Sequence, residues 1–545
     1  MCGIVALLGS QDASEEIDKV KWTELTKCSG RGPEDLRYER VNPSALLGFH
    51  RLAINGYGNN RAMQPLHIGQ CSLICNGEIY NWRSLYEEHD IVPATGSDCE
   101  VIAHLYMLHG IEETLKKLDG VFAFVLFDHT SRVTILARDR FGVRPLFVRP
   151  PAGPKDICLV ASEMKAIAVT DGGTGRICQF PPGHFLVSQA GMAPYLGAAE
   201  PEPYCAFPLR LATNRAGEPT HLQAIRKSLA AAVGKRTRNT DRGVTCLLSG
   251  GLDSSLVAAL VASQLPPGTL HTWSIGLKGS EDLAFAALAA KHIGTVHHSI
   301  EVEEDEFLAC IEDVIYAIES YDTTTVRASV GNWLISRYIR ENSDDKVVFN
   351  GDGSDEVCGG YLYMHCAPTA REFDKECRRL LRDIHFFDVL RSDRSISAHG
   401  LEARTPFLDA QFVETYLAIP EALRFHAGRG QCEKYLLRKA FDGSGLLPPA
   451  ILWRRKEAFS DGVSKSTESW FEIIQRHAFA LLKAQGVTAK SPAEAEKLYY
   501  RSVFDRHYRG NRGTIPYMWM PKFVEAADAS ARTLDIYANK KSLSK

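Results

Sequence analysis

Two groups of residues, far apart in the chain, combine the residue types and the spacing that catalysis requires. The first lies at the start, which reads Met1-Cys2-Gly3. A small second residue permits removal of Met1, and Cys2 would then carry a thiol and a free α-amine on one carbon. The ordinary pKa of such an amine, about 7.7–8.0, suits a proton acceptor near neutrality, so one residue would supply both nucleophile and base. Alone, a cysteine at position two is a weak signal.

Further residues could complete an amidase site around this nucleophile. Asn76 and Gly77 follow a predicted strand, and a carboxamide NH₂ beside a glycine N–H offers two donors to the oxyanion of a tetrahedral intermediate. The competing interpretation of Asn-Gly is a hairpin turn. Arg51 offers a guanidinium suited to bidentate capture of an amino-acid carboxylate. Glu78 and Asp98 offer carboxylates for the ammonium group, although each alone would be taken as a solvated surface charge.

The second group is the heptapeptide Ser249–Ser255, SGGLDSS, between an apolar strand and the start of a helix. Its two glycines let the backbone approach phosphate oxygens, its hydroxyls add donors, and the helix N-terminus favours an anion. No Gly-Lys-Ser/Thr follows, so this is not a Walker A loop. A serine-capped turn is the alternative, but seven consecutive residues of this kind favour a phosphate site.

Motifs in the first part of the chain resemble the N-terminal-nucleophile glutaminase domain of class II glutamine amidotransferases. They are Met1–Ile4, Arg31–Pro33, His50–Leu52, Asn76–Asn81, Gly96–Asp98, and Arg138-Asp139 with Gly142, Pro145 and Leu146. The resemblance implies that Cys2 attacks the glutamine carboxamide and that Asn76 and Gly77 hold the oxyanion. It also implies that Arg51, Glu78 and Asp98 bind the amino-acid end. The family usually has His-Arg-Gly-Pro-Asp where this chain has Gly30 to Glu34, so loop packing near the pocket should differ.

The heptapeptide resembles the PP-loop of ATP pyrophosphatases, which cleave ATP between the α- and β-phosphates. With further motifs the chain resembles glutamine-dependent asparagine synthetases from Cys2 nearly to the C-terminus. These motifs are Glu319–Asp322, Thr324–Ser329, Gly351–Glu356, Gly359–Tyr361, Glu402–Arg404, Pro406–Asp409 and Trp453–Gly462.

This resemblance implies an ATP site and a Mg²⁺ ion bound with the nucleotide. Leu247 and Ile275 would pack around the adenine, and Lys456 would neutralise pyrophosphate. Asp253 and Asp355 would hold the Mg²⁺. The complete set of implied ATP-binding residues is Leu247, Ser249, Gly250, Gly251, Asp253, Ser254, Ile275, Asn350, Gly351 and Lys456.

One loop departs from the family pattern Ser-Gly-Glu-Gly-Ser-Asp-Glu, because Asn350 replaces serine and Asp352 replaces glutamate. The carboxylate is kept but is one methylene shorter. Gly351 and Gly353 on either side indicate a tight loop, so Asp352 is expected to point into the nucleotide site as a catalytic group. A second departure is Thr405, where the family usually has valine.

The resemblance implies synthesis of L-asparagine from glutamine, aspartate and ATP through β-aspartyl-AMP, by a homodimer. β-Lactam synthetases share the fold but lack the N-terminal cysteine, so Cys2 argues against that class. A catalytically silent metabolite-binding protein is a further alternative, motivated by Gly30, Asn350 and Asp352. Release of AMP would distinguish the enzyme from the binding protein.

Two parts of the chain differ in pattern. Residues 2–190 contain short β-type runs with intervening amphipathic helices, which predicts stacked antiparallel sheets flanked by helices. Residues 191–219 are rich in proline and glycine and are interpreted as a linker. Residues 220–545 alternate strands and helices, which predicts a doubly wound parallel sheet covered on both faces, and are mostly helical from about Ala370.

Length and composition limit the remaining classes. The chain has 545 residues, 45% of them hydrophobic, and a formal net charge of −3, which is poor support for a dedicated nucleic-acid or membrane-surface protein. No apolar run approaches the ~20 residues of a membrane-spanning helix, and no signal peptide is apparent. The 14 cysteines show no zinc-like spacing, so reduced thiols in a cytoplasmic (cytosolic) protein are expected.

Overall fold

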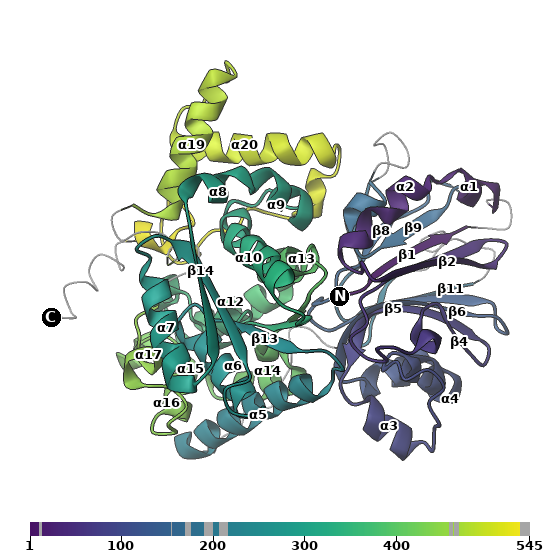
Figure 1. Ribbon diagram of the computed structural model, residues 1–545, viewed down its shortest axis with the longest axis horizontal. Helices are drawn as coiled ribbons and strands as arrows, with labels where there is room; N and C mark the ends of the chain where they lie inside the picture. Colours follow the sequence, from purple (N-terminus) through teal and green to yellow (C-terminus); the bar gives the residue numbers. More distant parts are fainter. Residues whose placement is uncertain are drawn as a thin grey trace.

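The computed structural model describes residues 1–9, 14–153, 155–168, 176–189, 200–205, 216–456, 462 and 468–534. Two parts of the chain lie side by side, and the N-terminus lies at the junction between them (Figure 1). The N-terminal part is built on two sheets, and the C-terminal part is built on one sheet with many helices. The position of the N-terminus places Cys2 close to both parts.

The N-terminal part contains two six-stranded sheets, and all of their strand pairs are antiparallel. The first has the order β10-β8-β9-β1-β3-β2, formed by Cys178–Gln179, Phe147–Arg149, Cys158–Ala161, Gly3–Leu8, Ala45–Arg51 and Asp35–Asn42. The second has the order β12-β11-β7-β6-β5-β4, formed by Glu202–Pro203, His184–Gln189, Val133–Arg138, Gly120–Asp128, Cys71–Ile79 and Leu66–Ile68. The prediction of antiparallel sheets is confirmed.

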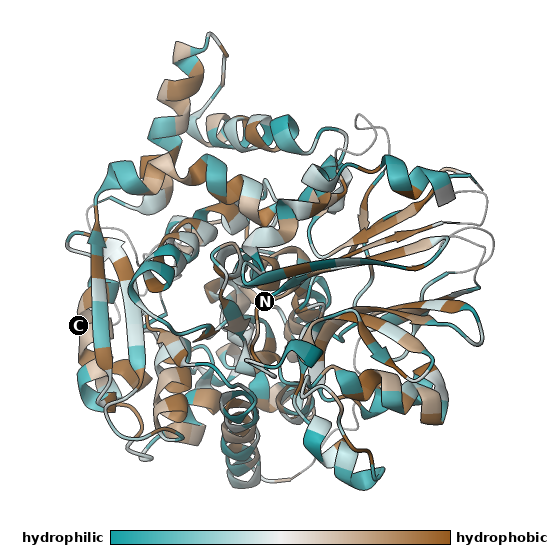
Figure 2. Ribbon diagram, turned by 45° about the vertical axis from the view of Figure 1, so that its right-hand side comes forward, coloured by the Kyte–Doolittle hydropathy of each residue, from teal (hydrophilic) through white to brown (hydrophobic). Residues whose placement is uncertain are grey.

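Hydrophobic residues of both sheets share one core. Ile4 and Phe49 of the first sheet belong to the same buried cluster as Ile74, Val125 and Leu136 of the second. The inner strands of both sheets are predominantly hydrophobic (Figure 2). Their interdigitation removes apolar surface from water, which is the main stabilising contribution to such a sandwich. Strand β1, which follows the nucleophile, is buried along its whole length and is therefore held rigidly.

Four α-helices accompany these sheets: α1 (Ser14–Lys19), α2 (Trp22–Leu25), α3 (Trp82–Glu88) and α4 (Glu100–Lys117). The three- and four-residue spacing of apolar residues from Cys99 to His109 is typical of a helix, and α4 forms there and continues to Lys117 beyond a kink at Gly110. Val101 and Leu105 of α4 are buried in one cluster with Phe122 and Phe124 of β6. This packing covers the outer face of the second sheet.

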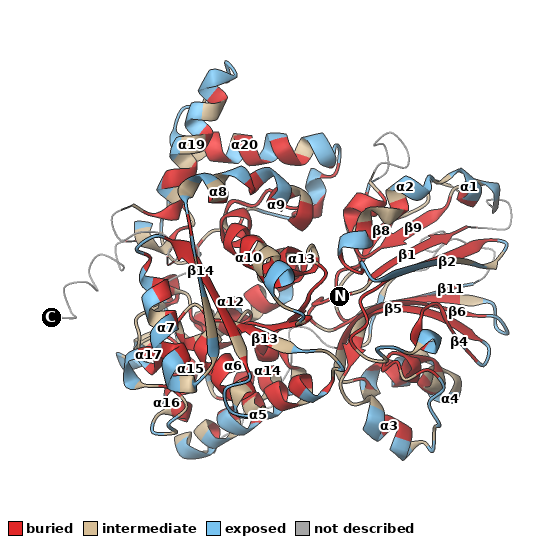
Figure 3. Ribbon diagram, viewed as in Figure 1, coloured by how far each residue is buried: buried red, intermediate tan, exposed pale blue. Residues whose placement is uncertain are grey.

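The C-terminal part contains a five-stranded parallel sheet of order β15-β14-β13-β16-β17. Its strands are Val296–Val302, His271–Leu277, Val244–Leu247, Val347–Phe349 and Glu402–Arg404. The first four coincide with strand-like runs of the sequence, and β14 is buried from Thr272 to Leu277 (Figure 3). The sequence does not predict strand β17, because three residues with two charges do not have the pattern of a strand.

Helices lie against both faces of this sheet and continue along the described chain to His507. They are α5 (Glu218–Arg238), α6 (Leu252–Ala262), α7 (Glu281–Ile293), α8 (Glu304–Ala309), α9 (Ile311–Ile318), α10 (Thr323–Asn342), α11 (Ser354–Cys358), α12 (Ala370–Asp383), α13 (Asp388–Ser397), α14 (Ala410–Leu417), α15 (Glu421–Arg424), α16 (Tyr435–Phe441), α17 (Pro449–Leu452), α19 (Trp470–Ala484) and α20 (Pro492–His507). The prediction of a mostly helical chain after Ala370 is confirmed. No helix among the described residues is long and apolar enough to cross a membrane.

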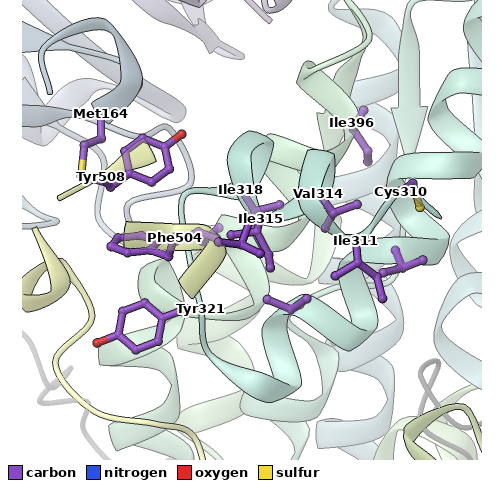
Figure 4. Packing of buried hydrophobic residues seen from close by; sticks show 14 of the residues in the cluster. Met164, Cys310, Ile311, Val314, Ile315, Ile318, Tyr321, Ile396, Phe504 and Tyr508 are labelled. Carbon is purple, nitrogen blue, oxygen red and sulfur yellow. The ribbon is translucent and has the colours of Figure 1, made fainter. Parts of the chain in front are cut away.

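The two parts are joined by a hydrophobic cluster as well as by the chain. Met164 of the N-terminal part belongs to the same buried cluster as Ile318, Tyr321 and Tyr508 of the C-terminal part (Figure 4). Most of the predicted linker, residues 191–219, lies outside the described residues. Within it, Glu202–Pro203 pairs with β11, and α5 begins at Glu218.

Candidate active sites

Cys2 lies immediately before β1, beside the end of the neighbouring strand β3. Its Sγ accepts a hydrogen bond from the backbone N–H of Leu52 at 3.4 Å. Burial raises the pKa of the Cys2 thiol to about 11. The thiol is therefore neutral near pH 7, and catalysis by Cys2 requires a base that removes its proton.

Asn76 and Gly77 lie within β5, opposite Ala123 and Phe122 of β6, so the hairpin-turn interpretation of this pair is wrong. A Cβ on Gly77 would lie 2.5 Å from the carbonyl oxygen of Val121, which explains the need for glycine. In the amide orientation that satisfies both of its ends, Asn76 Nδ2 donates to the Cys2 carbonyl at 3.0 Å. The structure therefore places Asn76, one of the two predicted oxyanion donors, in contact with Cys2.

The three residues expected to bind the amino-acid end lie in β3 (Arg51), in β5 (Glu78) and shortly before α4 (Asp98). Arg51 ends β3, and its Nη2 donates to the carbonyls of Gly56 (2.9 Å) and Asn59 (3.2 Å). Asp98 accepts from the backbone N–H of Ile79 at 2.7 Å, and burial raises its pKa to about 6. Glu78 is buried in β5. A guanidinium and two carboxylates beside one cysteine suit a zwitterionic amino acid.

Arg31 is a site residue that sequence reasoning missed, although it lies in a quoted motif. Its Nε donates to the Cys2 carbonyl at 3.0 Å, and its Nη1 donates to Asp393 Oδ2 of α13 at 2.7 Å. Arg31 therefore links the nucleophile to the C-terminal part. Next to it, a Cβ on Gly30 would lie 3.1 Å from the carbonyl oxygen of Ala398, so the two loops approach closely where the family usually has histidine.

Most of the residues predicted to bind the nucleotide line one cavity in the C-terminal part. It lies where β13, β14 and β16 end, which is the usual ligand-binding edge of a parallel sheet. The predicted residues that line it are Leu247, Ser249, Gly251, Asp253, Ser254, Ile275, Asn350, Gly351, Asp352, Asp355 and Lys456. Gly250 is not among the lining residues. Its φ of +71° and an ideal Cβ only 2.4 Å from the backbone N of Ala286 account for glycine there.

The heptapeptide forms a hydroxyl-lined turn before α6. Ser249 Oγ and Ser254 Oγ lie 3.0 Å apart, and the N–H of Gly251 donates to Ser249 Oγ at 3.3 Å. Helix α6 begins at Leu252, so its N-terminus opens toward the cavity that these serines line. Backbone N–H groups and hydroxyls in this arrangement suit a polyphosphate.

Two lysines and two aspartates form a charged cluster beside this turn. Lys434 Nζ lies 2.5 Å from Asp253 Oδ2 and 2.6 Å from Asp355 Oδ1, and Lys456 Nζ lies 2.7 Å from Asp355 Oδ2. These lysines hold the pKa of Asp355 below its ordinary value, so the carboxylate is ionised near pH 7. Lys434 was missed because no local motif marks it. It lies 181 residues from Asp253 in the sequence.

The carboxylates fit a Mg²⁺ ion that arrives with a nucleotide. Among the described residues no group of three or more His, Cys, Asp and Glu side chains could hold a metal by itself. Asp253 and Asp355 nevertheless provide hard oxygen ligands around one ammonium group. Mg²⁺ in phosphate-transferring sites is usually bound through one or two carboxylates plus substrate phosphates, so these two suffice.

Asp352 lines the same cavity and contacts an arginine of α13. Its Oδ1 accepts from Arg391 Nη2 at 2.8 Å, and its N–H donates to Asn350 Oδ1 at 3.2 Å. Its second oxygen, Oδ2, is buried and has no hydrogen-bond partner among the described residues. Burial raises the pKa of Asp352, an effect that Arg391 opposes. A free, buried acceptor in a cavity is suited to an N–H donor of a substrate.

Gly351 tests whether this cavity binds ATP. A Cβ at this position would lie 2.8 Å from Asp253 Cβ and 2.9 Å from Ser254 N, so Gly351→Ala should displace the turn. We expect the KM for ATP to rise about tenfold or more, since a loss of ~1.4 kcal/mol is tenfold. Gly513→Ala is the control, because nothing lies within 4 Å of that Cβ. Equal ATP kinetics in the two variants would contradict the assignment.

A cysteine with oxyanion donors in one part and a phosphate-binding cavity in the other define a glutamine amidotransferase coupled to an ATP-using synthetase. The model of the glutamine amidotransferase domain family matches residues 1–191, and that of the asparagine synthase family matches residues 224–375 and 366–530. The chain belongs to the asparagine synthetase family.

Similar curated proteins extend over nearly the whole chain. It is 42% identical to asparagine synthetase (glutamine-hydrolyzing) of Gallus gallus, 41% to that of Cricetulus griseus and 40% to that of Homo sapiens. Each alignment covers 98% of this chain and 99% of the relative. Both candidate sites lie within the residues that the two family models match.

Proposed function

We propose that this protein synthesises L-asparagine from L-aspartate, L-glutamine and ATP, and releases L-glutamate, AMP and pyrophosphate. The observation that supports the proposal is that one chain carries both groups of residues: Asn76 contacts Cys2 in one part, and the predicted nucleotide residues line one cavity in the other. Relatives named as glutamine-hydrolyzing asparagine synthetases match across both of them. The proposed domains are 2–190 for the glutaminase and 220–545 for the synthetase, with 191–219 between them.

Ammonia is released at Cys2. After removal of Met1, the α-amine of Cys2 takes the thiol proton, and the thiolate attacks the carboxamide carbon of glutamine. The Nδ2 of Asn76 and the N–H of Gly77 stabilise the oxyanion. Ammonia leaves with a proton, and water hydrolyses the thioester to glutamate. Burial lowers the pKa of the Met1 ammonium to about 6, and the same surroundings would keep the Cys2 amine neutral and basic.

Aspartate is activated in the second cavity. An oxygen of its β-carboxylate attacks the α-phosphorus of ATP, and pyrophosphate leaves. Lys434 and Lys456 neutralise the leaving group, and Mg²⁺ held by Asp253 and Asp355 would supply further charge neutralisation when bound. Ammonia then attacks the acyl carbon, AMP leaves, and Asp352 accepts an N–H hydrogen bond or a proton from the attacking nitrogen.

A cytosolic location and a homodimer belong to the same proposal. None of the 14 cysteines, all of which lie in the described part of the chain, is in a disulfide, which supports a reducing compartment. The homodimer follows from the family resemblance alone.

The products decide the reaction type. With glutamine, aspartate and ATP we expect AMP and pyrophosphate in equal amounts, because the α-phosphorus is attacked. With ¹⁸O in the aspartate carboxylate, the label should appear in AMP. Formation of ADP and orthophosphate would contradict the proposal, and absence of any nucleotide cleavage would favour a metabolite-binding protein. Cys2 itself argues against a β-lactam synthetase.

A further inference from the structure

The Glu78 carboxylate contacts residues of the synthetase part as well as a residue of the glutaminase part. Its Oε2 accepts from Asn55 Nδ2 at 2.6 Å, within the glutaminase part. The same oxygen accepts from Asn239 Nδ2 at 2.8 Å and lies 3.2 Å from Arg404 Nη2. Asn239 follows α5 and Arg404 ends β17. Two of the three groups that contact this carboxylate therefore come from the synthetase part.

We propose that Arg404 is a positioning residue for glutamine, which orients the Glu78 carboxylate for the substrate's ammonium group and favours its charged form. The inference rests on the proposed function, in which Glu78 binds that ammonium. A buried acid without a counter-charge protonates, and a neutral carboxyl group cannot bind an ammonium ion strongly. The synthetase part thus completes the glutamine site.

The guanidinium of Arg404 is fixed on several sides. It donates to Glu402 Oε1 through Nε at 2.9 Å and to the Asn239 carbonyl through Nη2 at 2.8 Å, and it also donates to the Arg236 carbonyl. The side chain is 1% exposed, so water does not screen its charge from Glu78. A fully anchored, buried arginine is suited to setting the orientation of one carboxylate.

Charges on four neighbouring groups act on the Glu78 proton. Burial raises the pKa of Glu78, the negative charges of Glu402 and Asp98 raise it further, and together they leave it above its ordinary value. The positive charges of Arg404 and Arg144 lower it. Loss of Arg404 would therefore move protonation of Glu78 to higher pH. Since glutamine requires the ionised form, its KM should rise as pH falls, and this rise should begin at a higher pH without Arg404.

Arg404 does not line the nucleotide cavity, and only its backbone carbonyl contacts a residue that does. Its carbonyl oxygen accepts from the N–H of Asn350 at 3.1 Å, beside the nucleotide cavity. A side-chain substitution keeps this carbonyl. We therefore expect ammonia-dependent synthesis to survive in Arg404→Met, and its activity reports that the variant is folded.

The test is the KM for glutamine, measured from about pH 6 to pH 9 in the full-length enzyme. We expect Arg404→Met to raise it about 30-fold or more, the effect of removing one member of a buried charge pair, and Arg404→Lys to restore much of the affinity. Arg140→Met is the matched control. Arg140 Nη1 lies 2.8 Å from Glu414 Oε1 across the same junction, and both side chains are partly exposed. Neither residue is one of the proposed glutamine-binding residues.

The outcomes distinguish the role of Arg404 from the assignment of Glu78 to the glutamine site. If Glu78→Gln raises the KM for glutamine but Arg404→Met leaves both the KM and its pH profile at parental values, the inference about Arg404 is wrong and the proposed function stands. If Glu78→Gln leaves the KM unchanged, the glutamine-site assignment itself is wrong. Should Arg404→Met fail to fold, Asn239→Ser removes a second donor from the same oxygen. An unchanged KM in that variant would overturn the inference.

Discussion

Replacement of Cys2 by alanine is expected to abolish glutamine-dependent asparagine synthesis and to leave ammonia-dependent synthesis near the parental rate. Cys2 is the proposed nucleophile of the glutaminase site, and an alanine side chain cannot form the thioester. The synthetase cavity contains no atom of Cys2. The measurement is the asparagine formed with glutamine or with ammonium chloride as nitrogen source.

The control for this prediction is Cys28→Ala, because Cys28 is buried near the same strand and has no assigned role. It should keep both activities. Glutamate release by Cys2→Ala at the parental rate would show that another residue is the nucleophile. A variant that cannot lose its initiator methionine should resemble Cys2→Ala, because the α-amine would then be a peptide nitrogen that cannot accept the thiol proton.

Replacement of Asp352 by alanine is expected to slow synthesis about 10²–10⁴-fold with either nitrogen source. Asp352 lines the nucleotide cavity, and its buried Oδ2 has no partner within the described chain. We expect this oxygen to receive an N–H group of the attacking ammonia. Removal of the carboxylate also leaves Arg391 without one of its two acidic partners.

Two comparisons make the Asp352 prediction specific. Asp352→Glu restores the usual residue of the family and should keep synthesis within about tenfold of the parent, a barrier change under ~1.4 kcal/mol. Glutamine hydrolysis at Cys2 should survive in Asp352→Ala, because that site lies in the other part. Parental synthesis by Asp352→Ala would mean that this loop has no catalytic role.

Local sequence was sufficient to predict the strands and turns that position most site residues. The apolar run before Ser249 and the glycines after it define a strand and a phosphate loop within one short segment. Asn76 and Gly77 follow a run of β-forming residues, which correctly indicates a strand. The sequence does not show that the strand continues through both residues, as β5 does. Signals of this kind depend on neighbours in the chain, so they can be recognised without tertiary structure.

The residues that sequence reasoning missed act through distant partners. Arg31 and Asp393 are separated by 362 residues, and Lys434 and Asp253 by 181. Arg404 contacts Glu78 across the junction of the two parts. The sequence does not show whether an arginine is buried or exposed. Arg404 is buried because β17 packs against the glutaminase part. These long-range ion pairs could not be predicted from residue spacing.

Transfer of the amide nitrogen is the measurement that tests the central claim most directly. The enzyme is supplied with glutamine labelled with ¹⁵N in its side-chain amide, together with unlabelled aspartate and ATP. We expect ¹⁵N in the side-chain amide of asparagine, with glutamate and AMP formed in amounts equal to the asparagine. If asparagine does not form, or if its amide stays unlabelled while glutamine is consumed, Cys2 and the nucleotide cavity do not serve one reaction.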